Sequence, residues 1–197
     1  WLINLYNFMD GINGIAGVEA VFVLSAIGAL AHSTSYGQML QSVHWVSAGA
    51  IIGFLLWNFP FGKVFMGDAG SAFLGFLVGT FMLWSAVTDG PSLAVWLILL
   101  SIFIVDSGYT LLVRACTGQQ WYAAHRLHAY QKLVDRWGGH GRVVSAAMAV
   151  NVGWLLPLAW LVQQQRLHSV AGLAAAYAPL MFVCLGLRAG IPEGSRV

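Results

Sequence analysis

The sequence predicts an all-α membrane protein: a polytopic transmembrane helix bundle with about six spanning helices, forming a single integral membrane domain over residues 1–197. Composition is the first observation behind this prediction. Hydrophobic residues make up 59% of the chain and charged residues only 8%, whereas a soluble domain usually carries about 25% charged residues. The second observation is that the apolar residues form runs close to the ~20 residues that cross a bilayer as a helix.

Six apolar segments account for the predicted spans. They cover residues 18–31, 43–57, 71–88, 92–113, 145–162 and 169–187. The first is short and contains Glu19, so we expect its helix to begin near Ile12. In the third, Gly75 and Gly79 form a stripe of small residues, which suits close helix packing or, as an alternative, a substrate groove.

The charged residues predict the orientation of the bundle. Six spans place residues 1–17, 58–70, 114–144 and the tail after Arg188 on one side, with Arg166 on the other. Eight of the nine Lys and Arg residues fall on the first side: Lys63, Arg114, Arg126, Lys132, Arg136, Arg142, Arg188 and Arg196. By the positive-inside rule this side is cytoplasmic. The net charge of +2 does not indicate a nucleic-acid partner.

The first polar stretch on this side, residues 1–17, combines spaced polar residues with glycine turns. Asn4, Asn7 and Asp10 recur every three residues, which places them along one helical face. The Asp-Gly and Asn-Gly pairs that follow, the second beginning at Asn13, indicate tight turns. A plain loop or a β-hairpin turn would explain the glycines, but not the regular spacing of the polar residues.

The second stretch, residues 58–70, begins with Asn58 and ends in Gly-Asp-Ala-Gly, directly before a predicted span. The N-terminus of a helix offers free backbone N–H groups that suit a phosphate. Asp68 suits Mg²⁺, which binds one or two carboxylates together with phosphate oxygens. Alternatively, Asp68 or Ser71 simply caps the helix.

The third stretch, residues 114–144, contains His-Arg-Leu-His-Ala-Tyr-Gln-Lys, in which we expect His125 and His128 to share a helical face. A zinc site lacks a Cys or acidic partner at ligand spacing. A basic loop at anionic lipid headgroups would explain the charge but not the His, Tyr and Gln residues. His32, His44, His140 and His168 are expected to be loop or interface residues.

Asp106 is a separate candidate, because it lies inside an apolar segment. A carboxylate at such a position is costly and usually faces the bundle interior or a polar partner. Its place near the cytoplasmic half of the span favours a role in supporting the site over a role in helix packing alone.

Together, the Asn-x-x-Asn-x-x-Asp-Gly-x-Asn-Gly start, the 58–71 stretch and the His-Arg-x-His-x-Tyr-Gln loop resemble one family. It is the polyprenyl-phosphate N-acetylhexosamine-1-phosphate transferases (glycosyltransferase family 4). The family includes phospho-MurNAc-pentapeptide translocase and the bacterial enzymes that start O-antigen chains on undecaprenyl phosphate. The resemblance covers roughly residues 1–145, and the last two helices agree with it only in type. Each motif is weak alone, but three in order on one predicted side are specific.

The resemblance implies that an N-acetylhexosamine 1-phosphate passes from a UDP-sugar to undecaprenyl phosphate with release of UMP. This would occur at the cytoplasmic face of a bacterial inner membrane and would initiate O-antigen or other cell-envelope glycan synthesis. The implied cofactor is Mg²⁺, with Mn²⁺ as an alternative. The implied catalytic residues are Asp68, which also binds the metal, Asp10 and His128, and the implied substrate-binding residues are Asn4, Asn7, Asn13, Asn58, Arg126 and His125. The sugar stays open, and so does the oligomeric state, with a homodimer as one option.

The sequence departs from the family pattern in three places. Many members have Asp where this chain has Asn13, and a run of His where it has Ala129 and Tyr130. These differences suggest a subgroup with a different sugar, and they put the role of His125 in doubt. The family's aspartate-rich motif, which belongs to an earlier cytoplasmic loop, is absent from residues 1–197. We therefore expect this chain to be the C-terminal portion of a larger transferase and to be inactive alone.

Two other classes of protein remain as alternatives. A transporter would place its polar residues near the middle of the membrane and across inverted repeats. A CDP-alcohol phosphotransferase also uses Asp-Gly and Mg²⁺ in a helical bundle. It should show further Asp residues at helical spacing, where this chain has Asn13, Ala16 and Gly17.

Overall fold

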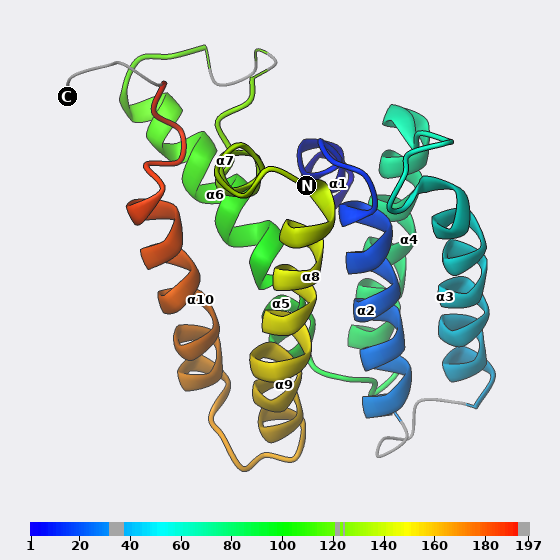
Figure 1. Ribbon diagram of the computed structural model, residues 1–197. Coiled ribbons are helices and arrows are strands. Elements are labelled where there is room, and N and C mark those ends of the chain that lie inside the picture. Colours follow the sequence, from blue (N-terminus) through cyan, green and yellow to red (C-terminus); the bar gives the residue numbers. More distant parts are fainter. Residues whose placement is uncertain (32–37, 121–122, 124, 193–197) are drawn as a thin grey trace.

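The computed structural model describes residues 1–31, 38–120, 123 and 125–192, and the regular elements within these ranges are all helical (Figure 1). This confirms the predicted all-α class. The elements are α1 (Leu2–Met9), α2 (Ile15–Leu30), α3 (Gln38–Asn58), α4 (Gly67–Val87), α5 (Leu93–Leu99), α6 (Ser101–Cys116), α7 (Ala129–Trp137), α8 (His140–Val150), the π-helical turn η2 (Asn151–Leu155), α9 (Leu156–Gln163) and α10 (Ser169–Gly186).

The chain is a multi-pass membrane protein. In the described ranges, four helices are long and apolar enough to cross a membrane: α3, α4, the run His140–Gln163 and α10. A fifth span exists if α5 and α6 form one, although they are bent by 74°. Helix α2 is apolar but has only 16 residues. The prediction of about six spans is therefore close, and α2 and the bent pair account for the difference.

The spanning segment predicted over residues 92–113 is interrupted at Leu100. Helix α5 stays in the core, where Val95, Trp96, Ile98 and Leu99 are fully buried. Helix α6 turns away from it toward α7 (Figure 1). Composition does not reveal this bend, because the residues on both sides of Leu100 are apolar and neither Pro nor Gly lies beside it.

Helix α2 lies in the interior of the bundle, between α3 and α8 (Figure 1). Apolar side chains are buried around its whole circumference, as is typical of an interior helix. Its one carboxylate, Glu19, accepts a 2.6 Å hydrogen bond from the side-chain amide of Asn151. Asn151 opens the π-helical turn η2, and such turns mark a local irregularity in a helix.

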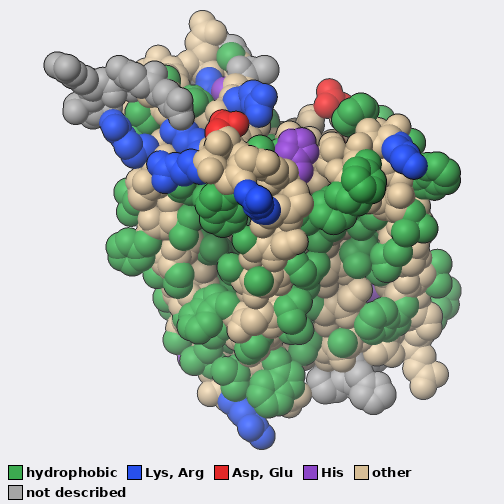
Figure 2. Space-filling view, viewed as in Figure 1, with side chains coloured by type: hydrophobic (Ala, Val, Ile, Leu, Met, Phe, Trp, Pro, Cys, Tyr) green, Lys and Arg blue, Asp and Glu red, His purple; other side chains and the backbone are tan. Residues whose placement is uncertain are grey.

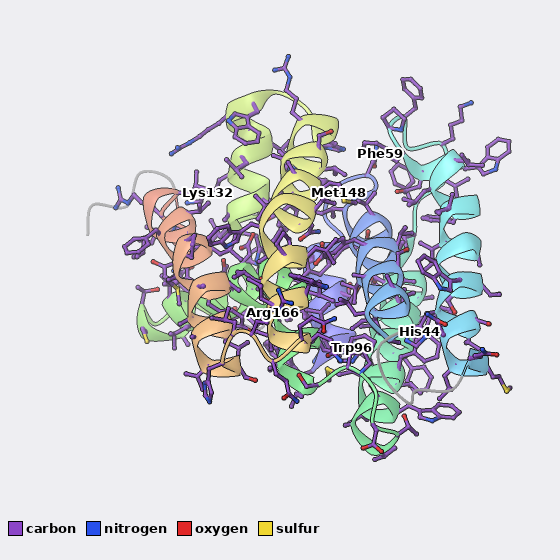
Figure 3. The ribbon with its side chains drawn as sticks, turned by 90° about the horizontal axis from the view of Figure 1, so that it is seen from below. His44, Phe59, Trp96, Lys132, Met148 and Arg166 are labelled. Atoms are coloured by element: carbon purple, nitrogen blue, oxygen red, sulfur yellow. The ribbon has the colours of Figure 1, made fainter. Side chains whose placement is uncertain are left out.

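His44 is fully buried, so its prediction as a loop or interface residue is wrong. Its ring centroid lies 4.5 Å from that of Phe81 and 6.1 Å from that of Trp96 (Figure 3). Helix α3 begins at Gln38 instead of near residue 43, so His44 lies in its second turn and not at its very start. His32 lies outside the described residues.

The three polar stretches meet at one end of the bundle. Helices α1 and α7 lie at this end, where α3 and α6 end and α4 and α8 begin (Figure 1). Most visible Lys and Arg side chains gather there (Figure 2). Arg166, on the α9–α10 link, lies at the opposite end, and Arg196 is outside the described residues. The stretches predicted as loops thus contain two helices and share one face. That this face is cytoplasmic stays a prediction.

Candidate functional site

A cavity of about 660 Å³ opens at this end of the bundle. Four segments surround it: the α1–α2 turn, the α3–α4 loop with the start of α4, the stretch before and into α7, and the start of α8. The lining residues are Asn7, Phe8, Asp10, Gly11, Ile12, Asn13, Asn58, Phe65, Met66, Gly67, Asp68, Ala123, His125, His128, Tyr130, Gln131 and His140. The three sequence motifs therefore come together in one hollow.

Two carboxylates face the cavity from different helices. Asp10 follows the last residue of α1, and Asp68 lies in the first turn of α4. Burial and the negative charge of Asp68 raise the pKa of Asp10 to about 7. A bound cation between the two carboxylates would remove this repulsion.

The capping alternative for Asp68 and Ser71 is not what the structure shows. No side chain caps the N-terminus of α4. The Ser71 hydroxyl instead donates to the backbone carbonyls of Gly67 and Asp68 in its own helix, at 3.2 and 3.3 Å. The Asp68 carboxylate is therefore not engaged as a cap and remains exposed at the cavity.

Asn58 joins two of the cavity walls. Its side-chain oxygen accepts a 2.7 Å hydrogen bond from the Gly14 N–H, and its side-chain nitrogen donates to the Val64 carbonyl at 2.8 Å. Gly14 has φ +86°, and a Cβ at this position would also meet the ring of Phe59 at 2.5 Å. Because Asn58 is buried and both ends of its amide are used, the geometry favours a positioning role over direct substrate binding.

His140 belongs to the site, although it was expected to be a loop or interface residue. The Asn13 N–H donates to its Nδ1 at 3.3 Å, which connects the α1–α2 turn to the start of α8. The only signal in the sequence was a Gly-Gly-His-Gly segment directly before a predicted span on the same side of the membrane.

The segment before α7, which lines the cavity, is not the helix that we expected there. His128 precedes the first residue of α7, and His125 lies in irregular chain, so the two do not share a helical face. Their rings meet edge to face, with centroids 4.9 Å apart. Within the described residues, the Nε2 atom of each ring is buried without a hydrogen-bond partner. Asp106 lies next to His128, with Oδ1 3.2 Å from Nδ1.

Tyr130 connects α7 to the α1–α2 turn, a contact that the motifs did not reveal. Its hydroxyl accepts the Gly11 N–H at 3.0 Å and donates to the Phe8 carbonyl at 3.1 Å. Burial raises the pKa of Tyr130, and the charge of Asp106 adds to this effect. The hydroxyl therefore stays protonated and keeps its donor role.

Seven of the nine predicted site residues line the cavity: Asn7, Asp10, Asn13, Asn58, Asp68, His125 and His128. Asn4 and Arg126 do not, and both are exposed. The roles of all nine residues in catalysis or binding stay predictions.

The donor set at the cavity suits a hard cation. Within the described chain, no group of three or more His, Cys, Asp and Glu side chains is arranged to hold a metal ion. Mg²⁺ does not require such a group, because it binds one or two carboxylates and completes its shell with phosphate and water oxygens. Asp10 and Asp68, with amide side chains nearby, fit this chemistry better than they fit zinc.

Comparisons with known proteins agree with this picture. Residues 1–86 match the model of glycosyl transferase family 4. The chain is 32% identical over 141 residues to a probable undecaprenyl-phosphate N-acetylglucosaminyl 1-phosphate transferase of Bacillus subtilis, which covers 68% of this chain and 38% of that relative. It is 42% identical over 79 residues to a phospho-N-acetylmuramoyl-pentapeptide-transferase of Streptococcus pneumoniae, which covers 38% of this chain.

The chain spans only 38% of the length of the first of these relatives and 24% of the second. No solved structure matches the chain significantly.

Proposed function

Because the chain belongs to glycosyl transferase family 4, we propose that the protein transfers an N-acetylhexosamine 1-phosphate from a UDP-sugar to undecaprenyl phosphate. The names of the two relatives describe reactions of this type. The convergence of Asp10, Asp68, His125 and His128 on one cavity at the end of the bundle carries the proposal. Synthesis of a cell-envelope glycan would follow from this first step.

The reaction exchanges one phosphoanhydride for another. An oxygen of the lipid phosphate attacks the phosphorus that carries the sugar. The bond from that phosphorus to the bridging oxygen breaks, and UMP leaves with the bond's electron pair. Both reactants are anions, so the protein must position them and offset their charge, and it needs no nucleophile of its own.

Each group of lining residues has a place in this scheme. Asp68 and Asp10 would hold Mg²⁺, which when bound neutralises diphosphate charge and stabilises the leaving UMP. His125 and His128 would hydrogen-bond the diphosphate through their unpartnered Nε2 atoms. Asn7 and the α1–α2 turn would contact the nucleotide.

The N-terminus of α4 supports an anion at this site. Its first turn, which carries Asp68, has free backbone N–H groups and no side-chain cap, so the positive end of the helix dipole faces the cavity. Helix α7 also begins at the cavity, but Asp106 already accepts the N–H groups of Ala129 and Tyr130. Of these two helix ends, α4 therefore remains available to a phosphate.

The cavity lies where the two substrates would meet. A lipid phosphate cannot leave the bilayer, whereas a nucleotide sugar arrives from water. A cavity at one end of the spanning helices would be within reach of both. The positive-inside rule predicts that this end is cytoplasmic, which is where a nucleotide sugar would be available.

The proposal is tested with Asp68→Asn in the full-length protein. We expect Mg²⁺-dependent UMP release to fall by at least about 100-fold, because one charged metal ligand is lost. Asp89→Asn is the matched control, since Asp89 is exposed on the α4–α5 link at the opposite end of α4. It should keep wild-type activity. Wild-type activity in Asp68→Asn would contradict the metal role, and a panel of UDP-N-acetylhexosamines would identify the sugar.

A further inference from the structure

Asp106 is only 5% exposed, and its carboxylate contacts four groups beside the cavity. Its Oδ1 accepts the Ala129 N–H at 2.9 Å and the Thr110 hydroxyl at 3.2 Å, and it lies 3.2 Å from Nδ1 of His128. Its Oδ2 accepts the Tyr130 N–H at 2.9 Å. One carboxylate of α6 thus organises both the start of α7 and the histidine that precedes it.

The contact with His128 determines which ring nitrogen carries a proton. An ionised carboxylate only accepts hydrogen bonds, so the contact with Asp106 requires Nδ1 to be the donor. Nε2 is then the nitrogen available to a ligand, as an acceptor in the neutral ring or as a donor in the charged ring. Within the described chain Nε2 is buried without a partner, and His128 lines the cavity.

The aromatic contacts of the His128 ring do not fix the positions of its nitrogens. In the capping box of α7 the His128 side chain also faces the Gln131 N–H, which competes with the Asp106 contact for Nδ1. Phe8 and Tyr130 stack on it with centroids 6.4 and 5.7 Å away, and His125 meets it edge to face. These contacts restrict the plane of the ring, but a ring flipped by 180°, which exchanges Nδ1 with Cδ2 and Nε2 with Cε1, would satisfy them equally well. Asp106 removes this ambiguity by holding the Nδ1 side.

We propose that Asp106 is a positioning residue for the reaction: it keeps His128 protonated at Nδ1 and thereby directs Nε2 toward the diphosphate of the nucleotide sugar. The role of Nε2 rests on the proposed function, whereas the protonation of Nδ1 does not. The competing interpretation is that Asp106 serves only to cap α7.

Protonation of Nδ1 is measured directly in the wild-type protein. Nitrogen-15 NMR of histidine-labelled full-length protein in nanodiscs distinguishes the two ring nitrogens, and loss of one signal in His128→Gln assigns the residue. We expect Nδ1 to carry a proton in wild type. An unprotonated Nδ1 would overturn the proposal, whether or not any Asp106 variant folds.

The kinetic test uses Asp106→Asn with Thr110→Val as its matched control. The control removes one hydrogen bond to the same Oδ1 but keeps the contact with His128. We expect kcat for UMP release to fall about 10- to 100-fold in Asp106→Asn, and Thr110→Val to stay within about threefold of wild type. A comparable fall in both variants would show that the effect does not depend on the contact with His128, and it would overturn the proposal.

A double-mutant cycle separates the two interpretations further. If Asp106 acts through His128, then Asp106→Asn should lower kcat no further in a His128→Gln background. Full additivity would overturn the proposal. Absence of UMP release in the wild-type protein would instead refute the proposed function, and the NMR result would still decide whether Asp106 orients His128.

Discussion

Replacing Gly75 with alanine should displace the helix that leads to Asp10. Gly75 is buried in α4, and a Cβ at this position would lie 2.4 Å from the Leu2 carbonyl oxygen and 2.7 Å from the Ile3 Cα. Both atoms belong to the backbone of α1, so they cannot rotate out of the way. Helix α1 would have to shift by about 1 Å to restore ordinary van der Waals separation.

The shift should affect activity more than stability. Helix α1 ends directly before Asp10, whereas Asp68 belongs to α4, so the two carboxylates would move relative to each other. A 1 Å misplacement of reacting groups costs about 100-fold in rate. Overpacking costs about 1–3 kcal/mol of unfolding free energy, and the better helix propensity of Ala offsets about 1 kcal/mol of it. We therefore expect an approximately 100-fold loss of kcat/KM with at most about 2 kcal/mol of destabilisation.

Gly79→Ala is the matched control for this experiment. Its Cβ would lie 3.4 Å from the Cδ1 atom of Leu2, a flexible side chain that can adjust. This variant should keep wild-type activity and gain slightly in stability. UMP release and thermal unfolding of the two full-length variants provide the measurements. Equal activity in both variants would show that the close approach at Gly75 does not position α1.

Two further substitutions test how the cavity walls are held. Gly14→Ala should lower the free energy of unfolding by about 1–3 kcal/mol, because φ is +86° and the new Cβ would meet Phe59; thermal unfolding measures this. Gly138→Ala has φ +68° but open space around its Cβ, so its free energy of unfolding should fall only by the part due to backbone strain. Tyr130→Phe leaves the Gly11 N–H without its partner, so we expect the free energy of unfolding to fall by about 1–3 kcal/mol. We also expect a raised KM for the nucleotide sugar in steady-state assays. An unchanged KM would separate this hydrogen bond from substrate binding.

The spanning helices could be predicted because a bilayer leaves the backbone few alternatives. A segment in lipid must satisfy its own hydrogen bonds, so a long apolar run becomes a helix. This explains the agreement for α4, α10 and the run His140–Gln163. The bend at Leu100 could not be predicted, because no Pro or Gly marks it. It follows from the packing of α5 in the core, which involves residues distant in sequence.

The residue types of the site could be predicted, but their partners could not. Spacing within short motifs identified Asp10, Asp68 and His128, which the fold brings to one cavity. Asn4 belongs to the same motif but lies six residues before Asp10, about 9 Å farther along a helix at 1.5 Å per residue. It is therefore carried away from the cavity.

The hydrogen bonds that hold the cavity walls join residues far apart in the chain. The contact between Tyr130 and Gly11 crosses 119 residues, and that between His140 and Asn13 crosses 127. No local pattern encodes such a pair. Each partner became recognisable only once the helices were placed, which is why His140 was not predicted to belong to the site.

Two of the basic residues at this end of the bundle also hold neighbouring segments of the chain in place. Lys132 donates to the carbonyls of Arg188 and Ile191, and Arg114 donates to the carbonyl of Gln120. These cations fix the chain around the site, and the described residues that line the cavity include neither Lys nor Arg. The two carboxylates and an incoming diphosphate would together place several negative charges in one hollow. With no Lys or Arg in the described lining, a bound divalent cation is the most direct way to balance that charge, which supports our proposal that Asp68 binds Mg²⁺.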